Sequence, residues 1–499
     1  MAAEPVWSVD PRTGKPRERV AVEATAADVD RSVRAAYAVR EALADRTVRA
    51  AFLRTAAGLL HGAGEKIVET ADAETALGPV RLTGELARTT AQLRAFAEVV
   101  EEGSFLDIRI DLPDPAAIPP RPDLRRWKIP LGVVAVYAAS NFPLAFSVPG
   151  GDTASALAAG CPVVIKAHPD HPATSELCAS LLRRAAAESG LPEDVVVLVH
   201  GFDAGVELVR HPLVSAAGFT GSVRGGRALF DAAAARPVPI PFHGELGSLN
   251  PVVITPAAVE ERAEEIGTGL AGSMTLGQGQ FCTKPGFVLA PSGDAGDRFV
   301  DALTISLRDA EPGVMLDHRM RDHFLTGTEG MARIPGVTAP VQPAAGGPHT
   351  VKAGFLAVDA KTLLDGPHPS LVEEVFGPVT VVVRYDSRTE VTDVLSRVPG
   401  NLTATLQIAE RDQDEDAAPL LAELTPLAGR VLVNGWPTGV AVAAAQHHGG
   451  PYPATTSTST SVGATAIERW LRPVTYQSTP GHLLPPELRD DNPLDLPRR

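Results

Sequence analysis

The chain has 499 residues, 44% hydrophobic and 21% charged, a composition typical of a globular protein large enough for two or three domains. Its formal net charge of -15 argues against a nucleic-acid-binding protein, because phosphates need a basic surface. No uncharged apolar run reaches the roughly 18 residues of a transmembrane helix, and the N-terminus lacks the basic and apolar regions of a signal peptide.

The predicted elements change in kind along the chain. Apolar residues recur at three-, four- and seven-residue spacing over residues 25–104, which predicts helices. The segment 112–130 is crowded with Pro and Arg and suits an arm or an edge strand. From residue 131 to about 245, short apolar strands alternate with helices. The strands are predicted at 133–136, 162–166, 195–199 and 216–220, with helices at 149–159 and 174–189 between them.

Strand–helix alternation of this kind predicts a parallel, doubly wound sheet, which binds ligands at the carboxyl ends of its strands. A second set of helices and strands follows residue 250. Its clearest members are predicted at 260–270, 299–307, 379–384 and 404–408. The Thr- and Ser-rich block 455–462 resembles low-complexity sequence, but apolar sequence resumes directly after it, so we expect an ordered loop.

Polar residues stand at the predicted strand ends. Asn141 follows the strand at 133–136 and can aim its amide at an oxyanion, although an Asn here also suits a simple turn. Lys166 ends the next strand in a chain with seven lysines and 38 arginines, and its alternative is a surface lysine. Ser222 begins a helix whose free N–H groups can hold a phosphate, as many ordinary helix caps also can.

One of the three cysteines lies in a glycine-rich, nearly charge-free segment, Gly277–Thr283. Glycines there let the backbone turn tightly beside the Cys282 sulfur, so an activated thiolate could act as a nucleophile. A buried structural cysteine is the alternative, and it is the interpretation we prefer for Cys161 and Cys178. Three cysteines cannot form a disulfide framework and none has metal-ligand spacing, so we expect a cytoplasmic protein without a metal site.

Glu245 lies 37 residues before Cys282, between Gly244 and Leu246 and directly after an apolar run. This setting is unusual for a solvated surface acid and suits a general base beside a thioester.

These segments stand in a fixed order, and together they resemble the aldehyde dehydrogenase superfamily over nearly the whole chain. The segments that carry the resemblance are Asn141-Phe142-Pro143, Lys166, Phe219-Thr220-Gly221-Ser222, Glu245-Leu246-Gly247, Gly279-Gln280-x-Cys282 and Glu374-x-Phe376-Gly377-Pro378. The resemblance is strongest to the α-ketoglutaric semialdehyde (2,5-dioxovalerate) dehydrogenase branch. The segments that carry this finer match are 141–153, 166–169, 435–440, 448–455 and 467–477. Bacterial long-chain fatty aldehyde dehydrogenases share some of these segments.

The resemblance implies an α/β fold with two doubly wound parallel-sheet domains and an oligomerisation arm. It places a cofactor-binding domain at 1–111 and 131–245 and a catalytic domain at 246–445. Residues 112–130 and 446–499 then form the arm and the C-terminal segment of a homodimer or homotetramer.

The resemblance also implies a role for each matched residue. Cys282 would be the nucleophile, Glu245 the general base, and Asn141 an oxyanion donor together with the backbone N–H of Cys282. Lys166 would bind the adenosine ribose and Ser222 would face the pyrophosphate. Glu374 would bind the nicotinamide ribose, with Phe376 near the ring.

The implied activity is NAD(P)-dependent oxidation of an aldehyde to a carboxylate through a thioester. NAD-specific relatives carry a Glu three positions after the lysine, where it binds the ribose 2′-hydroxyl. This chain has Pro169 there, so no carboxylate at that position would repel the 2′-phosphate of NADP. Some NADP-using relatives have an Arg in the next strand–helix loop, whereas residues 201–205 here contain no basic residue. His168 could contact the phosphate, and we expect NADP or dual use.

Three functions remain open at this point. The first is oxidation of α-ketoglutaric semialdehyde, and the second is oxidation of long-chain fatty aldehydes. The third, from a different class, is a cysteine-dependent thiol hydrolase that pairs Cys282 with His243 or His448. The ordered Lys166 and Ser222 segments argue against the hydrolase, which has no use for them. A non-catalytic structural protein on the same fold is a further alternative, and it would not need to keep Cys282, Glu245 and Asn141 together. A carboxylate on the substrate would need a cationic partner, and no arginine is placed by sequence alone.

Overall fold

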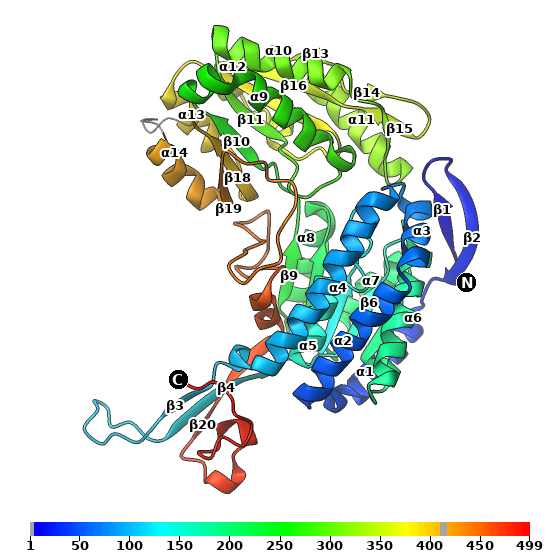
Figure 1. Cartoon of the computed structure of the whole chain (residues 1–499), viewed down its shortest axis with the longest axis vertical. Helices are drawn as coiled ribbons and strands as arrows, with labels where there is room; N and C mark the ends of the chain where they lie inside the picture. The colour runs from blue at the N-terminus through cyan, green and yellow to red at the C-terminus, as the bar shows by residue number, and fades with distance from the viewer. Residues whose placement is uncertain (1–3, 410–416) are drawn as a thin grey trace.

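The computed structural model describes residues 4–409 and 417–499 and has two lobes and a projecting arm (Figure 1). The lower lobe in that view contains the N-terminal half of the chain, and the upper lobe contains most of residues 250–433. In the described part of the chain, no helix is both long and apolar enough to span a membrane.

The lower lobe begins with an antiparallel hairpin, β1 (Pro5–Asp10) and β2 (Lys15–Val22), which the sequence patterns did not reveal. The helices predicted over 25–104 are present. They are α1 (Ala26–Ala38), α2 (Arg46–Gly62), α3 (Gly64–Thr75) and α4 (Pro79–Glu102). Thr25 and Asp28 form a capping box that satisfies the first amides of α1, and Gly103 ends α4 in the left-handed conformation.

The lower lobe is built on a five-stranded parallel sheet in the order β7-β6-β5-β8-β9. The predicted strands are confirmed, and β9 is added at the edge. Strands and helices follow one another as β5 (Val133–Tyr137), α5 (Gly151–Ala159), β6 (Val163–Lys166), α6 (Pro172–Glu188), β7 (Val196–Val199), α7 (Phe202–Arg210), β8 (Val214–Thr220), α8 (Val223–Ala234) and β9 (Phe242–Glu245).

Strand β5 is buried on both faces because helices cover both sides of the sheet. Val134 and Val136 pack with α2, α5 and α6, whereas Val133 and Ala135 pack with α1 and α7 on the other side. This two-sided burial is why the strand is continuously apolar.

The upper lobe holds a seven-stranded sheet in the order β13-β16-β17-β11-β10-β18-β19. It is parallel except for the edge strand β13, which runs antiparallel to β16 and departs from the predicted all-parallel sheet. Its principal elements are β10 (Pro251–Ile254), α9 (Pro256–Thr275), β11 (Phe287–Pro291), α10 (Asp294–Arg308), α11 (His318–Ala332), β13 (Thr338–Val341), β16 (Gly354–Asp359), α12 (Ala360–Leu364), β17 (Val379–Tyr385), α13 (Arg388–Leu395), β18 (Asn401–Gln407), α14 (Ala417–Leu424) and β19 (Ala428–Val433).

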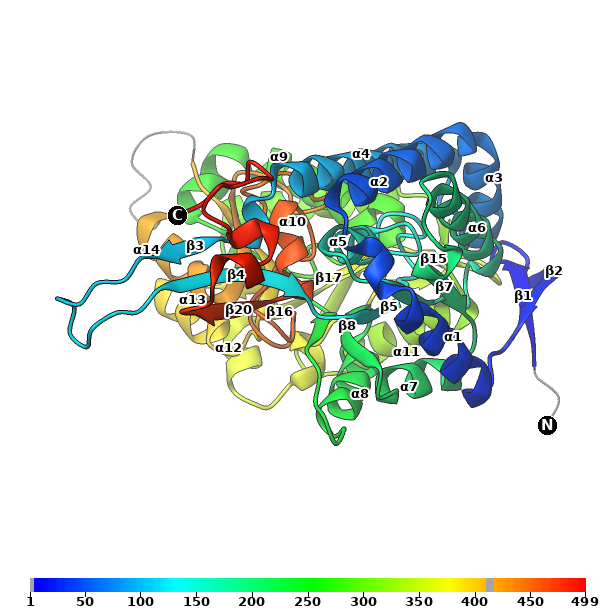
Figure 2. The ribbon, with the colours of Figure 1, turned by 90° about the horizontal axis from the view of Figure 1, so that it is seen from below.

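The arm is a three-stranded antiparallel sheet of β3 (Arg109–Asp111), β4 (Leu124–Pro130) and β20 (Leu471–Gln477). The expected edge strand within 112–130 is therefore β4. The buried Arg125 guanidinium pairs with Asp123 at 2.9 Å and with Asp490 at 2.7 Å, which fastens the C-terminal residues to the arm. Figure 2 shows the arm and the β1–β2 hairpin at opposite ends of the molecule.

The chain returns from the upper lobe along the edge of β9 before it enters the arm. The amide of Leu246 donates to the carbonyl of Ala454 at 2.7 Å, and the amide of Thr456 donates to the carbonyl of Gly244 at 3.0 Å. The Thr- and Ser-rich block is thus an ordered loop, as expected, and it lies beside Glu245.

Candidate active site

Cys282 lies in a loop between α9 and β11 that is shaped by backbone packing. Gly277, Gln278 and Gly279 all have positive φ, and a Cβ on Gly279 would lie 2.4 Å from the carbonyl carbon of Gly377. The amide of Asn250 donates to the Cys282 carbonyl at 2.8 Å and holds the loop in place. The sulfur therefore sits at a defined position between the two lobes.

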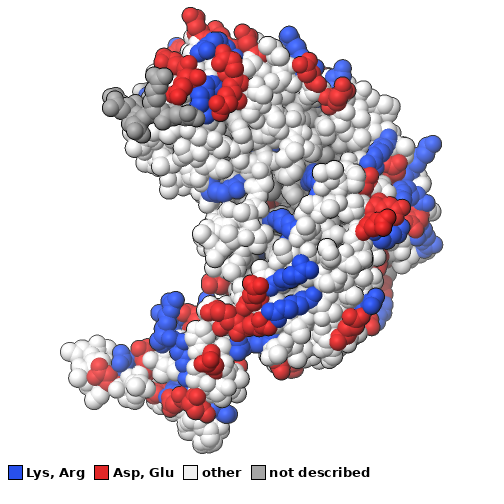
Figure 3. Space-filling model, in the orientation of Figure 1, with Lys and Arg blue, Asp and Glu red and all other residues white. Residues whose placement is uncertain are grey.

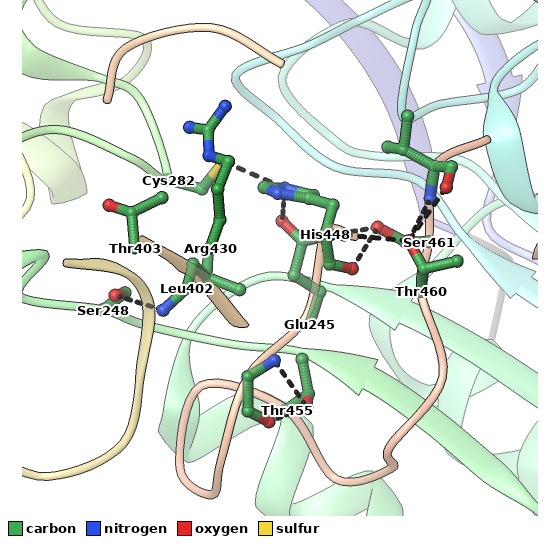
Figure 4. A network of polar contacts seen from close by, with 12 residues as sticks. Glu245, Ser248, Cys282, Leu402, Thr403, Arg430, His448, Thr455, Thr460 and Ser461 are labelled. Atoms are coloured by element: carbon green, nitrogen blue, oxygen red, sulfur yellow. Dashed lines mark hydrogen bonds and ion pairs between the residues drawn. The ribbon is translucent and has the colours of Figure 1, made fainter. Parts of the chain in front are cut away.

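Glu245 ends strand β9 and is buried, with 3% of its surface exposed. One carboxylate oxygen accepts a hydrogen bond from His448 Nε2 at 2.9 Å, and the other accepts from the Ser461 hydroxyl at 2.7 Å. The same His448 nitrogen lies 3.7 Å from the Cys282 sulfur. Figure 4 shows His448 between the acid and the thiol, with Ser461 on the far side of the carboxylate.

The local charges set the protonation of the acid and the thiol. Burial pushes the pKa of Glu245 upward, but the charge and hydrogen bond of His448 and the Ser461 hydroxyl outweigh it and hold that pKa below its ordinary value. Burial, followed by the charge of Glu245, raises the pKa of the Cys282 thiol well above 9. Glu245 is therefore ionised and Cys282 is a protonated thiol at neutral pH.

Asn141 follows β5 and reaches the Cys282 loop. Its side-chain Nδ2 donates to the carbonyl of Gln280 at 3.0 Å, and its own backbone carbonyl accepts from Arg81 at 2.5 Å. Phe142 packs edge-on against Phe281, with ring centres 5.2 Å apart. An amide nitrogen carries two hydrogens, and among the described residues Gln280 uses one of them, so a second N–H of Asn141 is available to a ligand.

The residues matched to the adenosine end lie where β6 ends. Burial lowers the pKa of Lys166 to about 8. The ring of His168 stacks on His171, and its Nδ1 accepts from the amide of Asp170 at 3.2 Å. Burial lowers the pKa of His168 well below its ordinary value, so the imidazole is neutral.

A carboxylate lies one residue beyond Pro169, where the sequence patterns did not point. Burial and the charge of Asp317 raise the pKa of Asp170 to about 8 despite Arg319, 3.4 Å away, and Lys166. Asp170 therefore carries little negative charge at neutral pH.

The residues matched to the pyrophosphate and the second ribose meet at Gly247. Ser222 caps α8 by accepting from the amide of Gly225 at 3.2 Å. A Cβ on Gly247 would lie 2.5 Å from Glu374 Oε2 and 3.1 Å from Val223, the first residue of α8. Burial raises the pKa of Glu374 to about 7, although the nearby Lys284 ammonium opposes this. The half-buried Phe376 follows on the same segment.

Sequence reasoning gave His448 a part only in the hydrolase hypothesis and gave Ser461 none. Both contact Glu245 from more than 200 positions away in the chain, and only the path of the returning segment brings them there. The one available signal was the pair of histidines, His447 and His448, directly before Gly449-Gly450.

A thiol-reactivity experiment tests this charge arrangement. Glu245→Gln removes the negative charge that raises the pKa of Cys282, so alkylation of Cys282 by iodoacetamide at pH 7 should become about tenfold faster, the change for each unit of pKa. Peptide mass spectrometry distinguishes Cys282 from the buried Cys161 and Cys178, which serve as internal controls. Slower alkylation would mean that Glu245 deprotonates the thiol instead of opposing its ionisation.

Comparisons with known proteins give the family and the fold of this chain. The chain is 48% identical to alpha-ketoglutaric semialdehyde dehydrogenase 2 of Azospirillum brasilense, with 98% of this chain and 94% of that protein covered. It is 44% identical to alpha-ketoglutaric semialdehyde dehydrogenase of Acinetobacter baylyi, over 99% and 95%. Aldehyde dehydrogenase 21 of Physcomitrella patens shares the fold, with a TM-score of 0.81, 18% identity and 97% and 96% covered. The model of the aldehyde dehydrogenase family matches residues 2–473, and the chain belongs to this family of NAD(P)-dependent enzymes.

Proposed function

We propose that this aldehyde dehydrogenase oxidises α-ketoglutaric semialdehyde to α-ketoglutarate, with Cys282 as nucleophile and Glu245 as general base. The observation that carries the proposal is the convergence of a thiol, an ionised buried carboxylate and the Asn141 amide at one place between the lobes. The substrate half rests on the two relatives named for this activity, which match the chain along nearly its whole length.

In the first half of the reaction the Cys282 thiol gives up its proton to solvent water. The sulfur then forms a bond to the aldehyde carbon as the carbonyl π bond breaks, which gives a thiohemiacetal oxyanion. The free N–H of Asn141 stabilises the oxyanion, an interaction whose loss commonly costs about 3 kcal/mol. A bound nicotinamide would supply the hydride acceptor for this carbon. Loss of that hydride would leave Cys282 carrying a thioester.

In the second half Glu245 takes a proton from water as the water oxygen attacks the thioester carbon. The carbon–sulfur bond breaks, the carboxylate product leaves, and the Cys282 thiolate is restored. Until water arrives, the His448 N–H occupies one Glu245 oxygen at 2.9 Å and lies beside the sulfur. We assign His448 the role of orienting the carboxylate and favouring the thiolate by hydrogen bonding.

The arrangement does not favour a cysteine hydrolase. A nucleophile–histidine–acid relay uses one ring nitrogen for the nucleophile and the other for the acid. Here the same nitrogen, Nε2, faces both Cys282 and Glu245, while Nδ1 is buried without a partner in the described part of the chain. The donor atoms of these three residues lie within 4.8 Å of one another, as in a metal site. The carboxylate oxygens, however, are already hydrogen-bonded.

The residues present fit a nicotinamide dinucleotide. The N-terminus of α8 with Ser222 offers hydrogen-bond donors to a pyrophosphate, and the absence of a side chain at Gly247 lets Glu374 approach that terminus. Lys166 and Glu374 would hold the two riboses, and Phe376 would pack near the nicotinamide. We propose NADP with NAD as an alternative, because Pro169 removes an acid and the buried Asp170 is largely neutral.

We also infer a homodimer or homotetramer joined through the arm, and a cytoplasmic location. Strand β20 lies at one edge of the β20-β4-β3 sheet and offers backbone groups to a second copy. The three free cysteines are consistent with a reducing compartment. The molecular mass in solution, measured by light scattering, tests the assembly.

A panel of aldehydes tests the activity. We expect kcat/KM for α-ketoglutaric semialdehyde to exceed that for hexanal and dodecanal by about tenfold or more, the value of one charge-assisted contact. Cys282→Ala should abolish turnover with every aldehyde and keep cofactor binding, while Cys178→Ala should keep activity. A strong preference for dodecanal would assign the enzyme to the fatty aldehyde branch.

Pre-steady-state kinetics separate the two halves of the reaction. Because Glu245 is assigned to water activation, Glu245→Gln should keep a burst of reduced cofactor and slow steady turnover by roughly 100-fold or more. Loss of the burst, with cofactor binding intact, would move the role of Glu245 to the first half.

Cofactor choice is tested at Pro169, which is exposed and has room for a longer side chain. Pro169→Glu places a carboxylate opposite a 2′-phosphate, and like-charge repulsion should lower the NADP/NAD ratio of kcat/KM by about tenfold. Pro169→Gln is the neutral control. A ratio unchanged in both variants would show that the 2′-phosphate binds elsewhere.

A further inference from the structure

Two arginines on α4, Arg81 and Arg88, lie beside the active site and form no ion pair within the described part of the chain. Arg81 and Arg88 are seven residues apart, which is two helical turns, so they share one face of α4. Both guanidinium nitrogens Nη1 and Nη2 of Arg88 are buried and have no hydrogen-bond partner among the described residues. The same is true of Nε and Nη1 of Arg81. Burying an unpaired cation is costly, so such groups point to a missing anion.

Both guanidinium groups are fixed against aromatic rings that surround the nucleophile. Arg88 lies over Phe146, 5.1 Å from the ring centre, and Phe146 lies 5.9 Å from the ring of His448. Arg81 lies over Phe281, the residue before Cys282, at 4.5 Å. Such stacking holds a planar guanidinium in a set orientation and leaves its edge free to bind an anion.

The buried acid between them, Glu85, attracts both arginines but leaves those buried nitrogens without a hydrogen bond. Glu85 accepts hydrogen bonds from the amides of Leu144 and Ala145 at 2.8 and 2.9 Å and so fastens the loop after Asn141. Among the described residues, Oε2 of Glu85 has no hydrogen-bond partner, and neither do Nη1 of Arg81 or Nη1 and Nη2 of Arg88. Burial raises the pKa of Glu85 against the charges of Arg81 and Arg88, and burial lowers the pKa of both arginines.

The two arginines differ in how many of their guanidinium nitrogens already form hydrogen bonds. Arg81 already donates to the backbone carbonyl of Asn141 at 2.5 Å, and the missing side chain of Gly277 makes room for its Nη1. Arg88 has two free terminal nitrogens, the fork that matches a carboxylate. Figure 3 shows Lys and Arg atoms around the hollow between the two lobes. Helix α4 begins beside this hollow in Figure 1.

We propose that Arg88, flanked by Arg81, binds the carboxylate at the far end of the substrate and so makes the enzyme specific for short aldehydes that carry an acid. This inference rests on the proposed function and deepens it. The rings of Phe142, Phe146 and Phe281 would contact the carbon chain between the aldehyde and the acid. A fatty aldehyde would place an alkyl tail against the unpaired cations, which is unfavourable.

The test compares a charged and an uncharged aldehyde of the same chain length, α-ketoglutaric semialdehyde and pentanal. Arg88→Met should lower kcat/KM for the semialdehyde by about 30-fold or more, mainly through KM, and change that for pentanal less than about threefold. Inhibition by α-ketoglutarate should weaken in parallel. Arg88→Lys keeps the charge but not the fork and should fall between. Arg94→Met, at an exposed position of the same helix, is the control and should match the wild type.

Equal losses on both aldehydes in Arg88→Met and Arg88→Lys, with unchanged melting temperature and cofactor binding, would overturn the proposal. Arg88 would then act on the thiol or on the fold. If Arg88→Met does not fold, Arg88→Lys alone decides, since only a carboxylate contact makes its loss selective for the semialdehyde. If the wild type instead prefers succinic semialdehyde, the proposed substrate fails. A selective loss on succinic semialdehyde in Arg88→Met would then still support the carboxylate site.

Discussion

The active site depends on the buried negative charge of the Glu245 carboxylate. Removing a carboxylate from water is expensive unless hydrogen bonds replace its hydration, and two side chains, His448 and Ser461, supply them here. Both come from the segment that returns along β9, so this segment must cross the site before the chain can reach the arm. The position of His448 beside the sulfur follows from the same requirement. The need to stabilise the Glu245 charge therefore fixes where the C-terminal segment runs, and this segment in turn brings His448 beside the Cys282 sulfur.

Much of the fold was predictable because it depends on local patterns. The four N-terminal helices and the strands of the first sheet follow from apolar periodicity, and burial on both faces explains the continuous apolar runs. The β1–β2 hairpin was missed because its strands are largely exposed and carry mixed polar sequence, without the alternation that marks a half-buried strand. The antiparallel direction of β13 was missed because direction depends on the connection between strands and not on their composition.

The residues of the site also fall into those that local sequence patterns predict and those that depend on long-range contacts. Asn141, Glu245 and Cys282 stand next to recognisable local signals, a strand end or neighbouring glycines, and the structure brings them together. His448 and Arg88 have no such signal. His448 is found only through contacts across many residues of chain, and Arg88 only through terminal nitrogens that have no partner among the described residues. Asp170 also could not be interpreted from sequence alone. Its raised pKa results from burial and from the charge of Asp317 in the other lobe.

The contact between Gly279 and Gly377 has a consequence for how this sequence can change. The Cys282 loop rests directly on the backbone before Pro378, and a Cβ on Gly279 would overlap that backbone. A Cβ on Gly377 would meet the Phe324 ring at 2.5 Å, and both glycines have positive φ. A substitution at one of these glycines does not remove the clash caused by a substitution at the other. Active variants selected from a library randomised at both positions should therefore almost all keep both glycines. Two residues without any reactive atom thus limit sequence drift around the nucleophile as strictly as the nucleophile itself.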